Sequence, residues 1–121
     1  MRKILTVLVL TLALLLPSGV ALGKEFPAMT NVNPKKMWII KFSQPVDINS
    51  VSNSEICVKD SGGKIINTIL NLESDLKTIE MLLIENSYKD GDYVLTISKN
   101  ITSNGKHLDE ETILRFQVGN N

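Results

Sequence analysis

The stretch WIIKFSQPVDINSVSNSEICVKDSGGKII, residues 38–66, decides the fold class of this chain. Two runs in it place an apolar side chain at every second position: Trp38, Ile40 and Phe42, then Ile56 and Val58. A period of two is typical of a β-strand with one buried face. Proline and glycine residues separate and end the two runs, as they do in turns. The stretch therefore predicts two β-strands.

Four further runs of the same kind lie downstream, at 64–72, 77–84, 92–98 and 112–118. The side chains expected to face the core from them are Leu70, Leu72, Ile79, Met81, Leu83, Tyr93, Leu95, Ile97, Leu114, Phe116 and Val118. A helix over 65–83 is the competing interpretation, but the β-branched and Asn side chains within it favour strand or turn. Six strands with short turns between them predict an all-β fold, an immunoglobulin-like β-sandwich of about seven antiparallel strands.

Residues 1–23 are expected to form a signal-peptide helix that directs export. Two basic residues precede a 13-residue run of apolar residues and threonine (4–16), and Ala21 and Gly23 supply the small side chains that a signal peptidase requires. Thirteen helical residues span about 20 Å, short of the roughly 30 Å hydrocarbon core of a membrane. An uncleaved anchor is the alternative. No second apolar stretch follows, so we expect no membrane span once the signal is removed.

Removal of the signal leaves 98 residues, the size of one small sandwich domain. We expect 24–36, which contains Pro27 and Pro34, to be a linker or a ragged first strand, and 37–121 to be the domain. The whole chain has 13 basic and 13 acidic residues, and the mature chain has 11 and 13, a net charge of −2. Nucleic acids and anionic membranes are bound by clustered positive charge, so neither is an expected partner.

The order and spacing of several motifs resemble the SbsA-type bacterial immunoglobulin-like domain, found in S-layer and other secreted bacterial proteins. The matching residues are Phe42, Ser43, Pro45, Val46, Asp47, Ile56, Val58, Asp60, Gly62, Gly63, Asp75, Lys77, Thr78, Ile79, Met81, Gly91, Tyr93, Leu95, Ile97, Asn104, Gly105, Leu108, Phe116 and Val118. The resemblance covers about 37–118 and implies an all-β sandwich, usually one module of a longer surface protein. Leu76 stands where a hairpin glycine is usual in that family, which predicts a wider turn.

The chain is poor in catalytic side chains, since it has one cysteine, Cys57, and one histidine, His107. A thiol nucleophile needs a base and an orienting third group, and a Ser-His-Asp triad would have to use His107 without a G-x-S-x-G context. One Cys and one His cannot supply the three ligands of catalytic zinc. We therefore expect no enzyme, no catalytic, cofactor-binding or metal-binding residues, and no cofactor. Cys57 is expected to be an unpaired thiol, with pairing between chains as the lesser alternative.

Acidic side chains are the remaining candidates for ion binding: Asp47, Asp60, Asp90, Asp92, Asp109, Glu110 and Glu111. Calcium takes six to eight oxygen ligands, and no D-x-D-x-D-G run is present, so turn formation and solvated charge are the preferred interpretation. A copper chaperone would need a His- and Met-rich N-terminus, which the mature chain lacks. Trp38 is expected in the core rather than on an exposed sugar-stacking platform. Tyr93 is expected to be a tyrosine-corner residue whose hydroxyl anchors backbone.

These patterns predict an exported, non-catalytic module that mediates binding or structural contacts at the bacterial cell envelope, either secreted or retained there. The expected partner is a cell-wall polymer or a surface protein, contacted through loops 44–54 and 99–111, and the chain itself is expected to be monomeric or weakly associating. The alternative is a small secreted carrier or inhibitor that binds a small ligand, a metal ion or an enzyme. A carrier needs a pocket of several hundred Å³, and a small sandwich filled by aromatic side chains is expected to have none.

Overall fold

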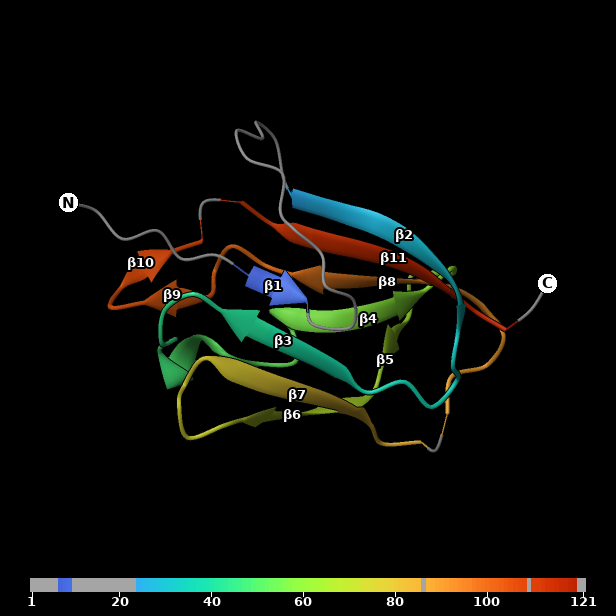
Figure 1. Cartoon of the computed structure of the whole chain (residues 1–121), viewed down its shortest axis with the longest axis horizontal. Helices are drawn as coiled ribbons and strands as arrows, with labels where there is room; N and C mark the ends of the chain where they lie inside the picture. The colour runs from blue at the N-terminus through green and yellow to red at the C-terminus, as the bar shows by residue number, and fades with distance from the viewer. Residues whose placement is uncertain (1–6, 10–23, 86, 109, 120–121) are drawn as a thin grey trace.

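The computed structural model describes residues 7–9, 24–85, 87–108 and 110–119, and it confirms the all-β sandwich (Figure 1). Every predicted run forms at least one strand. In chain order the elements are β1 (Val7–Val9), β2 (Lys24–Val32), β3 (Trp38–Phe42), the 3₁₀ turn η1 (Ile48–Ser50), β4 (Ile56–Asp60), β5 (Ile65–Ile66), β6 (Thr68–Leu72), β7 (Thr78–Leu83), β8 (Gly91–Ile97), β9 (Thr102–Ser103), β10 (Lys106–His107) and β11 (Thr112–Val118).

The strands form two larger sheets and one small hairpin. The four-stranded sheet has the order β1-β3-β7-β6, and the five-stranded sheet has the order β2-β11-β8-β4-β5. All neighbouring strands are antiparallel except β2 and β11, which are parallel and carry two irregularities in register. Strand β2 thus occupies most of the segment 24–36 and adds an edge strand beside the last strand of the fold. Strands β9 and β10 form a separate hairpin.

The long run at 64–72 contributes to both sheets. Strand β5 pairs with β4 in the five-stranded sheet, whereas β6 pairs with β7 in the four-stranded sheet, so the chain crosses between the sheets at Asn67. This crossing excludes a helix over 65–83. It also explains why the alternation in this run is less regular than in the others, because its two halves face the core from opposite sides.

The core lies between the two sheets and is filled by the alternating side chains that the sequence predicts. From the six runs, the buried members are Trp38, Ile40, Phe42, Ile56, Val58, Ile79, Met81, Tyr93, Leu95, Ile97, Leu114, Phe116 and Val118. Leu70, Leu72 and Leu83 are partly buried against them. Each fully buried large apolar side chain contributes about 1.5–3 kcal/mol relative to an exposed one. The period of two is therefore the main source of stability of this fold.

The expected signal-peptide helix is wrong for the three residues of 1–23 that the structure describes. Val7–Val9 form strand β1, paired antiparallel with β3. Two of the three residues are β-branched, which favours strand, and the edge of β3 offers unpaired backbone groups. The rest of 1–23 lies outside the described residues. No described helix is long and apolar enough to cross a membrane.

One end of the sandwich is closed by an aromatic cluster of Trp38, Tyr88, Tyr93 and Phe116. Phe116 lies at its centre, with ring centroids 4.8 Å from Trp38, 5.4 Å from Tyr88 and 5.3 Å from Tyr93. The Tyr93 hydroxyl donates a hydrogen bond to the Lys89 carbonyl oxygen at 2.6 Å, which confirms the predicted tyrosine corner. The opposite end carries η1 and the β9–β10 hairpin (Figure 1).

Candidate functional site

The two loops that the sequence marks for contact, 44–54 and 99–111, meet at the end of the sandwich opposite the aromatic cluster. Backbone hydrogen bonds join them directly, since the Asp47 amide donates to the Thr102 carbonyl oxygen at 2.8 Å. The Thr102 amide in turn donates to Ser50 Oγ at 3.0 Å. Two segments separated by more than fifty residues in the sequence therefore form one continuous surface, which we call the loop end.

The Asp47 carboxylate holds the loop end together. Its Oδ2 accepts hydrogen bonds from Thr102 Oγ1 at 2.6 Å and from the Gly105 amide at 3.0 Å. Its Oδ1 accepts one from the Asn104 amide at 3.1 Å. The hydrogen bond from Thr102, with those from Gly105 and Asn104, lowers the pKa of Asp47 below its ordinary value. Asp47 acts as an acceptor for the opposing loop.

Two features of the loop end face outward and are open to a partner. A shallow open hollow of about 740 Å³ is lined by Val46, Asp47, Ile48, Asn49, Ser50, Leu76 and Thr102. Ile48, at the start of the 3₁₀ turn, is 63% exposed, the most exposed large apolar side chain among the described residues. An apolar side chain on a fixed polar rim is the usual composition of a small protein-binding surface.

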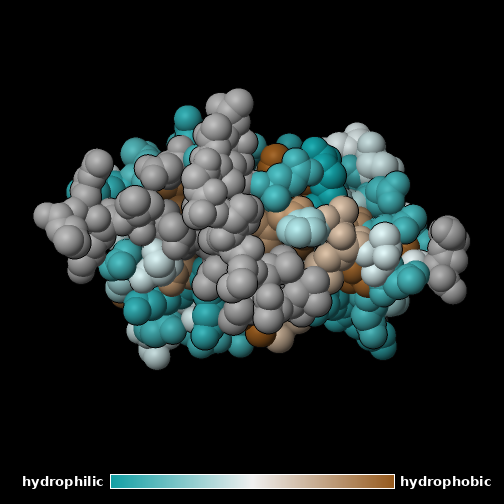
Figure 2. Space-filling model, turned by 45° about the horizontal axis from the view of Figure 1, so that its top comes forward, coloured by the Kyte–Doolittle hydropathy of each residue, from teal (hydrophilic) through white to brown (hydrophobic). Residues whose placement is uncertain are grey.

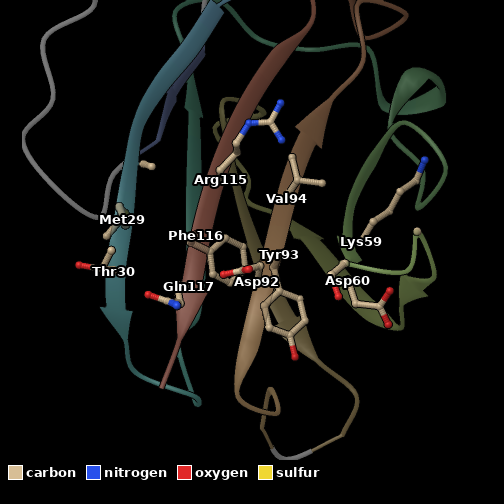
Figure 3. Close-up of a pocket in the computed structure, with 13 residues that line it drawn as sticks. Met29, Thr30, Lys59, Asp60, Asp92, Tyr93, Val94, Arg115, Phe116 and Gln117 are labelled. Carbon is tan, nitrogen blue, oxygen red and sulfur yellow. The ribbon is translucent and has the colours of Figure 1, made fainter. Parts of the chain in front are cut away.

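A second hollow of about 560 Å³ lies on the outer face of the five-stranded sheet (Figure 3). Met29 and Thr30 of β2, Arg115 and Gln117 of β11, Asp92 and Val94 of β8, and Lys59 of β4 are among its lining residues. The expectation that the protein has no hollow of several hundred Å³ is thus wrong. This space lies on the outer surface of the sheet and not between the two sheets, so the packing of aromatic side chains in the core does not fill it.

Charges of both signs border this sheet-face hollow. Lys59 and Arg115 flank Val94, because both pair with it across the strands β4, β8 and β11. Arg115 Nε donates to Glu25 Oε2 at 3.0 Å, and both side chains are more than half exposed. Figure 2, in which the top of Figure 1 comes forward, shows a hydrophobic area that borders the grey atoms on one side and hydrophilic residues on the other. The hollow therefore combines apolar surface with charges that solvent screens.

Cys57 and His107, the residues that a thiol–imidazole pair would need, lie in different sheets. Cys57 lies in β4 opposite Ile56 and Val58, as expected, but it is buried rather than exposed. Burial raises the pKa of the Cys57 thiol, which disfavours the thiolate. His107 is exposed in strand β10 of the terminal hairpin. The suggested pairing of Cys57 between chains is incompatible with this burial.

Acidic side chains at the ends of strands accept hydrogen bonds from backbone amides of the following turns. Asp60 Oδ1 accepts hydrogen bonds from the amides of Gly62 and Lys64 at 2.9 and 3.0 Å. Asp47 is occupied in the same way at the loop end. In the part of the chain that the structure describes, no group of three or more His, Cys, Asp or Glu side chains is placed to hold a metal ion. Trp38 is fully buried, so it offers no sugar-stacking platform.

Sequence reasoning missed several core residues that lie outside the alternating runs. Tyr88, Ile101 and Leu108 are buried although they lie in connections between strands, and Phe26 and Val32 are buried in β2. Ile101 and Leu108 are joined by a backbone hydrogen bond of 3.1 Å. They anchor the hairpin that carries half of the loop end. In the sequence, the burial of these two residues could have been inferred only from their position, since Ile101 precedes and Leu108 follows the turn residues Ser103-Asn104-Gly105.

Comparison with known proteins finds similarity at the level of fold. No protein-family model and no curated protein matches the chain. The N-terminal part of the bacterial S-layer protein SbsC is similar, with a TM-score of 0.54 and 12% identity over 78% of this chain and 23% of that one. The S-layer protein rSbsC(31-844) is similar with a TM-score of 0.54 and 12% identity, over 80% and 14%.

CopC from Methylosinus trichosporium OB3b has a TM-score of 0.49 and 15% identity, over 84% of this chain and 89% of that one. This chain spans less than a quarter of the length of either SbsC structure. At such low identity the likeness to SbsC shows a distant, S-layer-like β fold.

Proposed function

We propose that this chain is an exported, non-catalytic immunoglobulin-like module of the SbsA type that binds a partner at the bacterial cell envelope. The observation that carries the proposal is the loop end, where Asp47 fixes two distant loops into one surface. Loops that are ordered before binding lose little conformational entropy on association. The exposed Ile48 supplies an apolar contact on this surface. The partner is a cell-wall polymer or a surface protein.

Export and envelope location are supported by two independent features. The first 23 residues have the composition of a signal peptide. The sandwich is similar in fold to parts of two S-layer protein structures. The mature chain is near neutral, which suits contacts that do not depend on strong charge attraction.

The absence of catalysis is part of the same proposal. Cys57 is buried with a raised thiol pKa, and His107 is exposed in the β9–β10 hairpin, in another sheet. A nucleophile and its base have to lie within hydrogen-bonding reach. Alanine at Cys57 is expected to leave partner binding unchanged, and His107 is kept because it lies within loop 99–111 of the loop end. Loss of binding in Cys57→Ala, with the fold intact, would indicate a role for the thiol.

The test is recovery of the protein, expressed from all 121 codons, with the wall fraction of its producing bacterium, with and without 1 M salt. We expect retention in both conditions, and reduced retention of Ile48→Asp. Ile65→Asp is the matched control, because Ile65 is an exposed isoleucine in β5, away from the loop end. If both variants lost retention equally, the loop end would not be the surface that binds the partner. Complete recovery in the medium, with no wall or protein partner, would reject envelope binding.

The sheet-face hollow favours a second candidate function, that of a carrier for a small ligand. Its volume of about 560 Å³ lies in the range of small-molecule sites. Val94 is half-buried at its centre, so Val94→Trp is expected to fill it. A carrier would lose ligand-induced thermal stabilisation in this variant while Ile48→Asp keeps it. The envelope-binding proposal expects the opposite pattern in wall retention.

A further inference from the structure

The outer face of the four-stranded sheet departs from the polar exterior that alternation predicts. Three of the five exposed large apolar side chains lie on it or continue it: Met37 at 39%, Ile69 at 49% and Ile84 at 59% exposed. Half-buried Leu82 lies between them on β7. We call these four side chains the apolar patch. Contiguous apolar surface on a soluble domain commonly marks a protein-binding site.

The strand register places the patch in one cross-strand row. Ile69 of β6 pairs with Leu82 of β7. Trp38 of β3 pairs with Met81, so Met37, one residue earlier, continues the register opposite Leu82. Trp38 and Met81 point into the core, and their neighbours therefore point outward. The row runs Met37–Leu82–Ile69, with Ile84 just beyond the end of β7.

A second row on the same face is charged at its two ends. Lys41 of β3 pairs with Thr78 of β7. On the other side of Thr78, the Glu73 amide donates to the Thr78 carbonyl oxygen at 2.8 Å. Lys41 and Glu73 are both exposed. This row therefore reads Lys41–Thr78–Glu73, a cation and an anion on opposite sides of the central strand.

We propose that a second copy of this chain covers this face, related by a two-fold axis that runs along β7. Such an axis keeps each row in place and exchanges its two ends. Met37 then packs on Ile69 of the other copy, and Leu82 packs on Leu82. In the charged row, Lys41 meets Glu73 of the other copy, and this pairing occurs twice. The row between these two is Ile39–Glu80–Asn71. Under the same axis Glu80 meets Glu80 of the other copy, which opposes the association, and Ile39 meets Asn71. Within one chain, Glu80 also contacts the Glu73 carboxyl.

The occupant is a second copy because the apolar row and the charged row are each self-complementary under one axis, and of the three rows only the middle one is not. An unrelated partner would not require the cation and the anion to be symmetrically placed about β7. The three strands that carry the rows, β3, β7 and β6, lie about 4.8 Å apart, are about six residues long and present roughly 300 Å². Strand β1, on the far side of β3, lies outside this area. The area is well below the roughly 800 Å² per partner of a stable complex. The dimer is therefore weak, and it brings two loop ends together only where the chain is concentrated, as at a surface.

Sedimentation of the protein expressed from all 121 codons, from about 10 μM to about 1 mM, measures this association. We expect a monomer that converts to a dimer over this range. Leu82→Lys is expected to remain monomeric throughout, whereas Val94→Lys, the half-buried control on the other sheet's outer face, dimerises normally. A chain that stays monomeric at about 1 mM, or a folded Leu82→Lys that dimerises like the parent, would overturn the proposal.

A charge exchange tests the axis itself. Lys41→Glu alone places two anions opposite each other, and Glu73→Lys alone places two cations, so each variant is expected to self-associate about tenfold more weakly. A mixture of the two variants restores both pairs between chains, and we expect dimers at the parental level. This rescue acts between chains and cannot come from repair of either fold. Failure of the mixture to dimerise, with both variants folded, would exclude the two-fold along β7.

Discussion

The two ends of the sandwich are held together by different interactions. One end is closed by four aromatic rings, with Phe116 at their centre. The other end is closed by the Asp47 carboxylate, which accepts three hydrogen bonds from the opposing loop. Apolar packing is stronger per residue and insensitive to pH near neutrality, whereas a carboxylate clasp leaves loops at the surface and depends on ionisation. The fold is thus anchored at one end and presents contacts at the other.

The largest expected effect is at the aromatic end. Phe116→Ala removes the ring that contacts all three other members of the cluster and is expected to cost about 3–5 kcal/mol of unfolding free energy. Urea denaturation measures it. Ile113→Ala, on the same strand but facing outward and half-buried, is the control and is expected to cost far less. A loss below about 1 kcal/mol for Phe116→Ala would mean that the cluster does not anchor the fold.

Three of the four rings at the aromatic end could be predicted from the sequence, and the fourth could not, for a physical reason. Trp38, Tyr93 and Phe116 belong to alternating strands, so their burial follows from period two. Tyr88 lies in the connection before β8, where no periodicity exists, and its burial depends on tertiary packing. The residue type alone did not distinguish it from an exposed loop tyrosine.

The loop end shows the same limit more strongly. The two loops were identifiable as long and polar, and sandwiches place loops at their ends. Their union through Asp47 depends on which loops share an end and on the left-handed backbone at Asn104 and Gly105, which turns two amides toward one carboxylate. The sheet-face hollow was missed because alternation predicts only which side chains face out, and not the shape of the surface that they form.

The second largest effect is expected at alkaline pH, again at the aromatic end. Burial raises the pKa of Tyr88 to about 12, against about 10 in an unfolded chain. The folded state therefore favours the neutral phenol, and its stability is intact below pH 10 and falls as pH rises toward 12. The loss is about 1.4 kcal/mol per pH unit over that interval. Denaturation at pH 8, 10, 11 and 12 measures it.

Tyr88→Phe is the control for this alkaline loss. Among the described residues, the buried Tyr88 hydroxyl makes no hydrogen bond of good geometry, and Trp38 is the polar side chain that interacts with it. Its removal is therefore expected to leave stability at pH 8 nearly unchanged. Between pH 10 and 12 the variant should lose less stability than the parent. A smaller fall remains because burial also raises the pKa of Tyr93. If the unfolding free energy of the variant and of the parent fell in parallel with pH, ionisation of Tyr88 would not destabilise the folded chain.

A smaller and local effect is expected at the loop end under acid. The pKa of Asp47 is lowered in the folded chain, so its contribution is present above the unfolded pKa and is lost as pH falls through the folded value. Asp47→Ala should remove this dependence and speed hydrogen exchange of the Asn104 and Gly105 amides. The near-UV spectrum of the aromatic end should stay the same. If hydrogen exchange at both amides were unchanged, the hydrogen bonds to Asp47 would not be what orders the loop.

The smallest expected effect concerns Leu76, which lines the loop-end hollow. Leu76 adopts a left-handed backbone with φ of 59°, the conformation for which glycine is favoured. Its carbonyl oxygen accepts a hydrogen bond from the Val46 amide at 2.8 Å, so the turn cannot relax without disturbing the loop end. The left-handed conformation costs a side-chain-bearing residue about 1–2 kcal/mol. Glycine removes that cost but adds about 0.5–1 kcal/mol of unfolded-state entropy.

Leu76→Gly is therefore expected to change unfolding free energy by less than about 1 kcal/mol, with the lost contact of the half-buried side chain offsetting part of the relief. Leu76→Ala is the matched variant, because it loses the same contact but keeps the strained backbone. It should be less stable than the glycine variant by about 1 kcal/mol. Equal stability of the two would mean that the turn has no preference for glycine. Leucine at this position would then reflect packing at the loop end and not a tolerated strain.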